Sequence, residues 1–130
     1  MEKIPLIKIA AAEVHIMEAL WRKSPLSFDE IVAEVGPANG WAATTVRTLV
    51  TRLLRKKAIS GSKGKAGYVY KPLIARSAYV RSESKGLLDR LFEGEVTPLV
   101  AHLAEHRALT NRDMKKLEAL IAKLKARDNE

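Results

Sequence analysis

The chain lacks several features, and each absence excludes a class of protein. It contains no cysteine, so it forms no disulfide bonds, offers no thiolate ligand to a metal ion and has no cysteine nucleophile. It also lacks the apolar run of about 18 residues that a membrane-spanning helix needs. Lys8 and Glu13 interrupt the N-terminal apolar residues too early for a signal peptide. We therefore expect a cytoplasmic protein that does not enter a membrane.

Acidic residues are missing from the middle of the chain. None occurs between Glu34 and Glu83, a stretch that carries ten Lys and Arg residues. Of the formal net charge of +8, residues 1–73 supply +6 (12 basic, 6 acidic) and residues 74–130 supply +2 (11 basic, 9 acidic). A surface without carboxylates approaches a polyanion without repulsion, and each cation that meets a phosphate releases counterions. The first half of the chain is therefore expected to bind a polyanion.

Patterns typical of enzymes and of metal sites are absent as well. The sequence has no Gly-rich phosphate loop, no nucleophile elbow and no pair of carboxylates suited to acid–base catalysis. His102 and His106 are four residues apart, but no third ligand with suitable spacing accompanies them. We therefore expect no enzyme activity, no cofactor and no metal site.

Three helices are predicted in the first part of the chain from apolar spacing and from helix-capping residues. They cover residues 10–23, 28–35 and 43–57. Ser27, with Glu30 three residues later, has the pattern of a capping box at the start of the second helix. Gly36-Pro37 is expected to end that helix.

A β-hairpin is predicted directly after the third helix. Its strands cover residues 59–62 and 68–73, and a Gly- and Lys-rich turn over residues 63–67 joins them. Three helices followed by a basic hairpin make a winged helix-turn-helix, in which the hairpin is the wing and the third helix is the recognition helix. The fold class is therefore mainly α, with a DNA-binding domain over residues 1–73.

The predicted recognition helix is amphipathic, and its exposed face carries only hydroxyls and cations. Threonines at this position can reach base edges, thymine methyl groups or phosphates, and arginines can contact guanine or phosphate. Lysines at the tip of the wing can bind phosphates of the DNA backbone. We predict DNA contacts from helix 42–57 and wing 59–73, through Thr44, Thr45, Arg47, Thr48, Thr51, Arg52, Arg55, Lys56, Lys63 and Lys65. For Lys56 the alternative is a solvated charge that favours the helix dipole.

Residues 74–130 are predicted to form a helical dimerisation region. Helices are expected over residues 75–92 and 96–106, and Thr110 with Asp113 resembles a capping box for a last helix. Short helices so rich in leucine cannot bury their apolar faces alone. Packing against a second copy of the chain would bury them. The alternative is that they fold back on the N-terminal domain as additional core. The predicted interface consists of Leu87, Leu88, Leu91, Phe92, Leu99, Val100, Leu103, Leu117, Leu120, Ile121 and Leu124.

Several segments resemble the penicillinase-repressor (BlaI/MecI/CopY) family. The most specific block runs from Trp41 to Leu53, and the remaining segments are residues 12–13, 17–21, 30–32, 68–73 and 87–92. The resemblance implies a bacterial homodimeric repressor that binds a palindromic operator and controls a resistance or stress-response gene. It also implies a sensor or protease that relieves repression.

Two positions depart from the family pattern. The recognition helix of the family often begins Ser-Pro-Lys, whereas this one begins Ala42-Ala43-Thr44. The β-lactam-responsive members are cut between Asn and Phe, and the matching positions here are His102 and Leu103, the candidate proteolytic switch. The copper-responsive branch senses metal through a cysteine-rich tail, which this chain lacks.

Two other functions are compatible with the same pattern. The chain could be a nucleoid-type or RNA-binding winged-helix module that binds nucleic acid without a single operator. It could also be a winged helix that binds an acidic protein.

Overall fold

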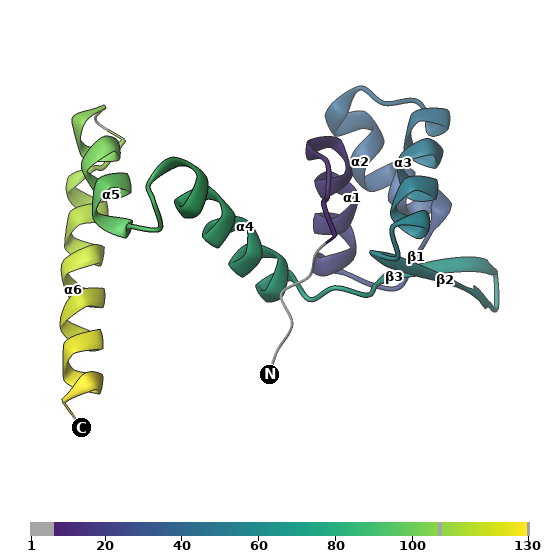
Figure 1. Ribbon diagram of the computed structural model, residues 1–130. Helices are drawn as coiled ribbons and strands as arrows, with labels where there is room; N and C mark the ends of the chain where they lie inside the picture. Colours follow the sequence, from purple (N-terminus) through teal and green to yellow (C-terminus); the bar gives the residue numbers. More distant parts are fainter. Residues whose placement is uncertain (1–6, 107, 130) are drawn as a thin grey trace. The chain divides into compact units, whose positions relative to one another are not determined.

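The computed structural model describes residues 7–106 and 108–129 (Figure 1). Within these ranges the chain forms six α-helices and three short strands. It divides into two compact units, of which the first ends at Glu83 and the second begins at Ser84.

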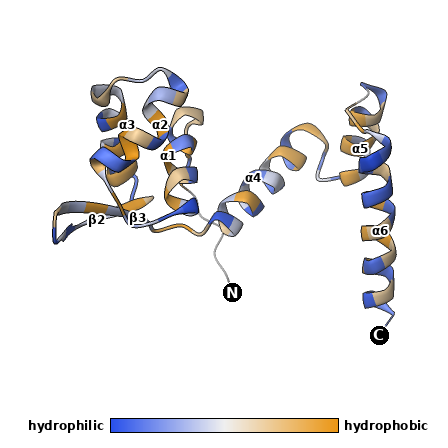
Figure 2. Cartoon of the chain, turned by 180° about the vertical axis from the view of Figure 1, so that it is seen from behind, coloured by the Kyte–Doolittle hydropathy of each residue, from blue (hydrophilic) through white to orange (hydrophobic). Residues whose placement is uncertain are grey.

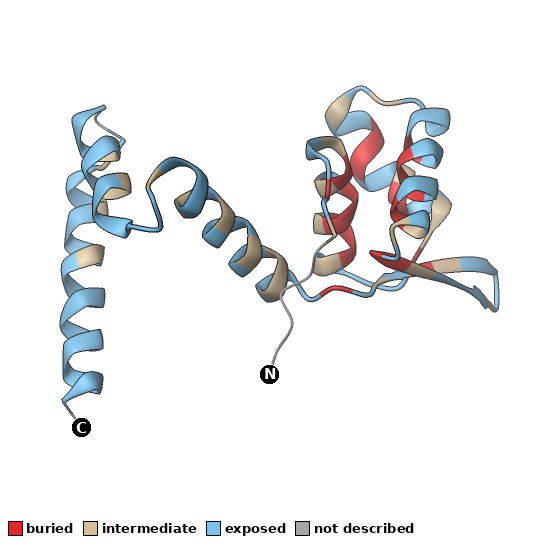
Figure 3. Cartoon of the chain, in the orientation of Figure 1, coloured by how far each residue is buried: buried red, intermediate tan, exposed pale blue. Residues whose placement is uncertain are grey.

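The first unit is built on three helices, α1 (Ala11–Arg22), α2 (Phe28–Asn39) and α3 (Ala43–Arg55). Their apolar sides face one another and form one core, seen in Figure 3 as the buried segments of the three helices. Burying one such side chain stabilises the folded state by about 1.5–3 kcal/mol. The largest fully buried apolar side chains are Ile16, Met17, Leu20, Ile31, Val46, Leu53 and Ile59.

The start of α2 is fixed by the predicted capping box. The hydroxyl of Ser27 accepts a hydrogen bond from the backbone N–H of Glu30 (3.2 Å), and the Glu30 carboxylate accepts one from the backbone N–H of Ser27 (2.9 Å). Hydrogen bonds from the Ser27 backbone and side chain hold the pKa of Glu30 below its ordinary value, because they stabilise the charged form. The predicted start of this helix is confirmed.

The predicted end of α2 is wrong, because the helix continues past Gly36-Pro37 to Asn39. Proline lacks the N–H that would bond one turn back, but in the last turn of a helix this removes a single hydrogen bond. The side chain of Asn39 donates to the Val35 carbonyl (2.8 Å), and the N–H of Trp41 donates to the Gly36 carbonyl (2.9 Å). These bonds satisfy the last carbonyls, and Gly40 ends the helix at a φ of 68°.

The wing is a tighter hairpin than the sequence predicts. Its strands β2 (Ile59–Gly64) and β3 (Gly67–Pro72) pair antiparallel as far as Gly64 opposite Gly67, so only Lys65 and Ala66 form the turn. The expected loop over residues 63–67 is therefore mostly strand. Three helices followed by this hairpin confirm the winged helix-turn-helix prediction.

A third strand, β1 (Leu26–Ser27), pairs antiparallel with β3 and gives the sheet order β1-β3-β2. This strand is not predicted from the sequence, because two residues are too few to show an alternating pattern. Since Ser27 is also the N-cap of α2, β1 fixes the start of that helix against the wing.

Residues after the wing also belong to the first unit. The indole N–H of Trp21 on α1 donates to the carbonyl of Ile74 (2.8 Å), and Arg76 pairs with Glu18 (3.2 Å). Tyr79 lies with its ring 5.6 Å from that of Trp21. These contacts explain why the compact unit reaches Glu83, beyond the domain boundary at residue 73 that the sequence suggests.

The second unit contains the end of α4 (Arg76–Leu91), α5 (Val96–Glu105) and α6 (Asn111–Asp128). The predicted capping box of α6 is present, since Thr110 and Asp113 each donate a backbone N–H to the other's side chain, both at 3.1 Å. None of the described residues from 84 onward is buried. Figure 2 shows hydrophobic residues on these helices, and Figure 3 shows that their surface is exposed or half-buried.

A partly buried ion pair ties the end of α3 to the start of α1. The carboxylate of Glu13 is 1% exposed, and its Oε1 accepts hydrogen bonds from the Lys56 ammonium (2.5 Å) and from the Ala10 N–H (2.8 Å). Lys56 also donates to the backbone carbonyl of Lys8 (2.9 Å). Among the described residues, Oε2 of Glu13 has no hydrogen-bond partner. The positive charge of Lys56 therefore offsets the free-energy cost of burying the Glu13 carboxylate.

We expect Lys56→Met to lower the free energy of unfolding by at least about 2 kcal/mol, because it leaves a buried carboxylate without its counter-charge. Urea unfolding measures the change. The control is Lys57→Met, at an exposed neighbour, which should stay within about 0.5 kcal/mol of the parent protein. Equal effects of the two substitutions would show that the ion pair has no structural role.

Candidate nucleic-acid interface

Divided along its axis, α3 has an inner half that faces the core and an outer half that faces solvent. The inner half is at most 5% exposed and consists of Val46, Leu49, Val50 and Leu53. The outer half is exposed and contains every predicted contact residue of this helix except Lys56, namely Thr44, Thr45, Arg47, Thr48, Thr51, Arg52 and Arg55. Packing of the inner half thus turns a face of hydroxyls and cations outward.

The start of α3 leaves polar backbone groups available. Ala42, at the N-cap, provides no side-chain cap, and uncapped N–H groups together with the helix dipole favour an anion at this end. One turn later, the hydroxyl of Thr48 donates to the carbonyl of Thr44 (3.1 Å). The hydroxyl of Thr48 therefore has only its acceptor capacity left for another partner, and its side chain also carries a methyl group.

Arg47 is held by an aromatic ring from another element. Its guanidinium carbon lies 4.0 Å from the ring centroid of Phe28, the first residue of α2. Both residues line a hollow of about 360 Å³, whose other lining residues are Ser27, Asp29, Ala66, Tyr68 and Tyr70. The hollow therefore joins α3, the start of α2 and the wing.

Folding brings one carboxylate to this surface. Asp29 is exposed and lines the same hollow as Arg47, although the chain from residue 35 to residue 82 has no acidic residue. A stretch without carboxylates in the sequence is therefore not the same as a surface without them. The exposed face of α3 itself fits the expectation, because that helix contains no acidic residue.

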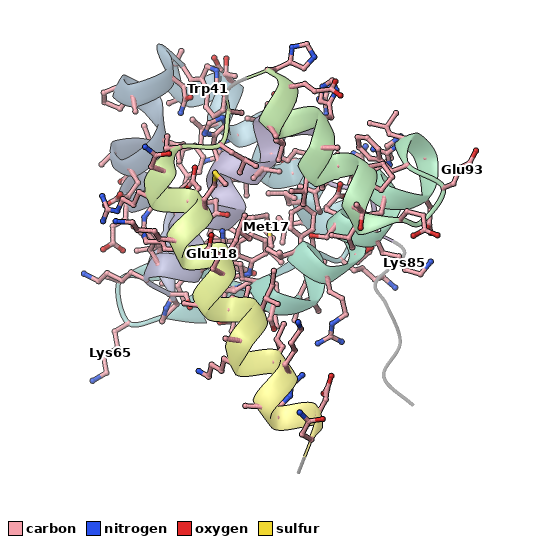
Figure 4. All side chains as sticks on the ribbon, turned by 90° about the vertical axis from the view of Figure 1, so that its left-hand side faces the viewer. Met17, Trp41, Lys65, Lys85, Glu93 and Glu118 are labelled. Atoms are coloured by element: carbon pink, nitrogen blue, oxygen red, sulfur yellow. The ribbon has the colours of Figure 1, made fainter. Side chains whose placement is uncertain are left out.

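Near its tip, the wing presents two lysines and one tyrosine to solvent. Lys63 and Lys65 are exposed, and Figure 4 shows the Lys65 side chain projecting outward from the ribbon. Tyr70 is buried in the core at 9% exposure, whereas Tyr68 is 60% exposed and lies opposite Lys63 in the hairpin. Of the two tyrosines of β3, Tyr70 therefore belongs to the core and Tyr68 to the surface.

Lys56 differs from the other predicted contact residues. Its ammonium is engaged by Glu13 and by the Lys8 carbonyl, as described above. We therefore leave Lys56 out of the candidate contact set. Phe28 and Tyr68 also belong to this surface and are not among the residues predicted from the sequence. The alternation of Tyr68 with Tyr70 is a signal for Tyr68, whereas no sequence pattern indicates the contact between Phe28 and Arg47.

The predicted dimer residues lie on exposed or half-buried positions of the second unit. Leu87, Leu91, Leu120, Ile121 and Leu124 are between 36% and 64% exposed. Leu88, Phe92, Leu99, Val100, Leu103 and Leu117 are half-buried. Val100 of α5 and Leu117 and Ile121 of α6 line an apolar hollow of about 340 Å³ with Ala104, Leu109, Met114 and Glu118. Met114 and Leu109 belong to this surface and were not in the predicted set.

The two histidines of α5 lie close together. The ring centroids of His102 and His106 are 4.5 Å apart, and that of Phe92 is 6.4 Å from His102. In the described part of the chain, no group of three or more His, Cys, Asp or Glu side chains is arranged to hold a metal ion. His102 and Leu103, the candidate proteolytic switch, lie inside α5.

Among the described helices, none is both long enough and apolar enough to span a membrane.

Comparisons with solved structures agree with this geometry. The monomeric form of Bacillus licheniformis BlaI, solved in complex with the blaP half-operator, is 33% identical, with a TM-score of 0.52 over 61% of this chain and 94% of that one. The DNA-binding domain of the repressor BlaI is also 33% identical, with a TM-score of 0.51 and the same coverage.

Sequence comparisons extend the similarity to nearly the whole chain. The penicillinase repressor of Bacillus licheniformis is 28% identical over 130 residues, which is 100% of both chains. The penicillinase repressor of Staphylococcus aureus is 30% identical over 115 residues, which is 88% of this chain and 91% of the relative. The family model described as Penicillinase repressor matches residues 9–123. The chain therefore belongs to the penicillinase repressor family, a family of repressors and not of enzymes.

Proposed function

We propose that this protein is a transcriptional repressor that binds operator DNA through α3 and the wing, and that it controls a resistance gene. The observation that carries the proposal is the outer half of α3, where every exposed polar side chain is a hydroxyl or a cation. Relatives named penicillinase repressor, and a BlaI structure solved with a half-operator, support it.

The first turns of α3 would enter the major groove. Thr44, Thr45 and Thr51 offer hydroxyls and methyl groups to base edges. Thr48 would act as an acceptor or as a methyl contact to thymine, because its hydroxyl hydrogen is already used. Arg52 has the length and the paired donors for guanine or phosphate. In this proposal α3 supplies the sequence selectivity.

Residues around the helix would bind the DNA backbone. Lys63 and Lys65 at the wing tip, and Arg55 near the end of α3, are exposed cations suited to phosphates. Tyr68 is exposed beside them and adds a hydroxyl donor. Such contacts set the register of the protein on DNA and make binding salt-dependent.

We further propose that the second unit forms a homodimer through the apolar faces of α4, α5 and α6. Its support is the lack of any buried residue from 84 onward in the described chain, together with the apolar hollow between α5 and α6. A dimer would bury these faces and would place two copies of α3 on a palindromic operator. In this proposal the DNA-binding domain is the first unit, which extends past residue 73 to Glu83, and the dimerisation domain is the second unit, from Ser84 onward.

The site of action and the relief of repression complete the proposal. A repressor that meets its operator in a bacterial cell acts in the cytoplasm. A sensor or protease could relieve repression by cutting the chain at His102-Leu103. That peptide bond lies within α5, so cleavage would require local opening of the helix.

We expect Arg52→Ala to weaken binding to the operator by about 1–3 kcal/mol, because the substitution removes a bidentate donor from the recognition face. The probe is a duplex recovered by selection from the organism's own sheared genome, and gel-shift titration measures the affinity. Loss of discrimination at one base position should accompany the loss of affinity. An unchanged affinity would contradict the assignment of α3 as the reading helix.

Lys65→Ala is the matched comparison, because it removes one exposed cation from the wing and none from α3. It should weaken binding to all duplexes alike and reduce the salt slope by about one unit per protomer. A parent protein that binds selected and random duplexes equally would instead indicate a nucleoid-type or RNA-binding module.

We expect Ile121→Glu to weaken dimerisation by tenfold or more, about 1.4 kcal/mol, because it places a charge in the apolar face of α6. Sedimentation equilibrium at micromolar concentration measures the change. Ala119→Glu adds the same charge about 160° around the same helix and should leave the dimer intact. If both variants remain dimers, α6 does not form the interface.

A further inference from the structure

The side chain of Arg47 has a partner that no other cation of the interface has. Its guanidinium lies over the Phe28 ring, 4.0 Å from the ring centroid. Phe28 follows the N-cap Ser27 and is half-buried against the core of the first unit. The ring is thus held by the capping box and the core, and it offers one face to the arginine.

Arg47 lines the hollow between the helices and the wing. The hollow that it lines is bounded by the start of α2 and by Ala66, Tyr68 and Tyr70 of the wing. When α3 lies in the major groove and the wing binds the adjacent DNA backbone, the DNA strand between α3 and the wing passes this hollow. With the ring on one side of it, the guanidinium still has N–H groups to offer, and a guanidinium can bind a phosphate bidentately.

We infer that Phe28 is a positioning residue for DNA binding, which holds Arg47 in the orientation that clamps a backbone phosphate between α3 and the wing. The inference rests on the proposed function and deepens it. Phe28 itself touches no DNA in this account; it acts only through Arg47.

Two physical effects make the ring matter. A free arginine loses much rotamer freedom when it binds, and an arginine already stacked on a ring loses less. The exposed carboxylate of Asp29 lines the same hollow, so an arginine released from the ring has a competing anion nearby. Stacking on Phe28 therefore lowers the cost of engaging a phosphate.

The test uses the full chain and the duplex recovered by selection, with binding titrated over a range of salt concentrations. Phe28→Leu keeps an apolar side chain but removes the aromatic face, and it should weaken binding roughly three- to tenfold. Phe28→Tyr keeps the ring and should restore the parent affinity. Arg47→Ala should weaken binding at least as much and reduce the salt slope by about 0.9 per protomer.

The decisive readout is the double variant. If Phe28 acts through Arg47, adding Phe28→Leu to Arg47→Ala produces no further loss of affinity. Val32→Ala controls for stability, because Val32 is another half-buried residue of α2 packed against the core, and below its unfolding temperature it should bind DNA as the parent does.

Each other outcome overturns the inference in a distinguishable way. If Arg47→Ala weakens binding but Phe28→Leu behaves like Val32→Ala, or if the two losses simply add, Phe28 does not position Arg47 and the proposed function stands. If Arg47→Ala leaves the affinity unchanged while Arg52→Ala lowers it, the phosphate clamp is absent but α3 still reads DNA. If neither arginine affects binding, the proposed function fails as well.

Discussion

The structure depends on the burial of one side of α3 against α1 and α2. Val46, Leu49, Val50 and Leu53 are enclosed in the core, so the helix cannot rotate without exposing them. Because successive turns repeat every 3.6 residues, this burial also dictates which residues face solvent. The threonines and arginines of the outer half are therefore presented in one fixed array. The ion pair between the buried Glu13 and the half-buried Lys56 holds the end of the same helix against the start of α1.

Local signals in the sequence predicted most of the first unit, and long-range contacts account for what was missed. The capping box of Ser27 and Glu30 and the amphipathic pattern of α3 are local, and both predictions are confirmed. Strand β1 exists only because it pairs with β3, more than forty residues later in the chain. The ion pair of Lys56 joins residues 43 positions apart, so spacing along the chain could not separate it from the exposed cations.

The second unit differs from the first in where its apolar residues lie. The first has a core of fully buried side chains, whereas the second has none in the described chain from residue 84 onward. Exposed apolar faces of this extent are a liability in a monomer and are typical of an interface. The same sequence thus encodes one unit that folds around its own core and one that we propose completes its core with a second copy.

The central claim is that two copies of α3 read a palindromic operator. Hydroxyl-radical footprinting of the full chain, on the fragment selected from the organism's own sheared genome, tests it most directly. The account predicts two protected half-sites related by two-fold symmetry, with their centres about 10 base pairs, or a small multiple of that spacing, apart. A single asymmetric footprint, or weak protection without a preferred position, would contradict it.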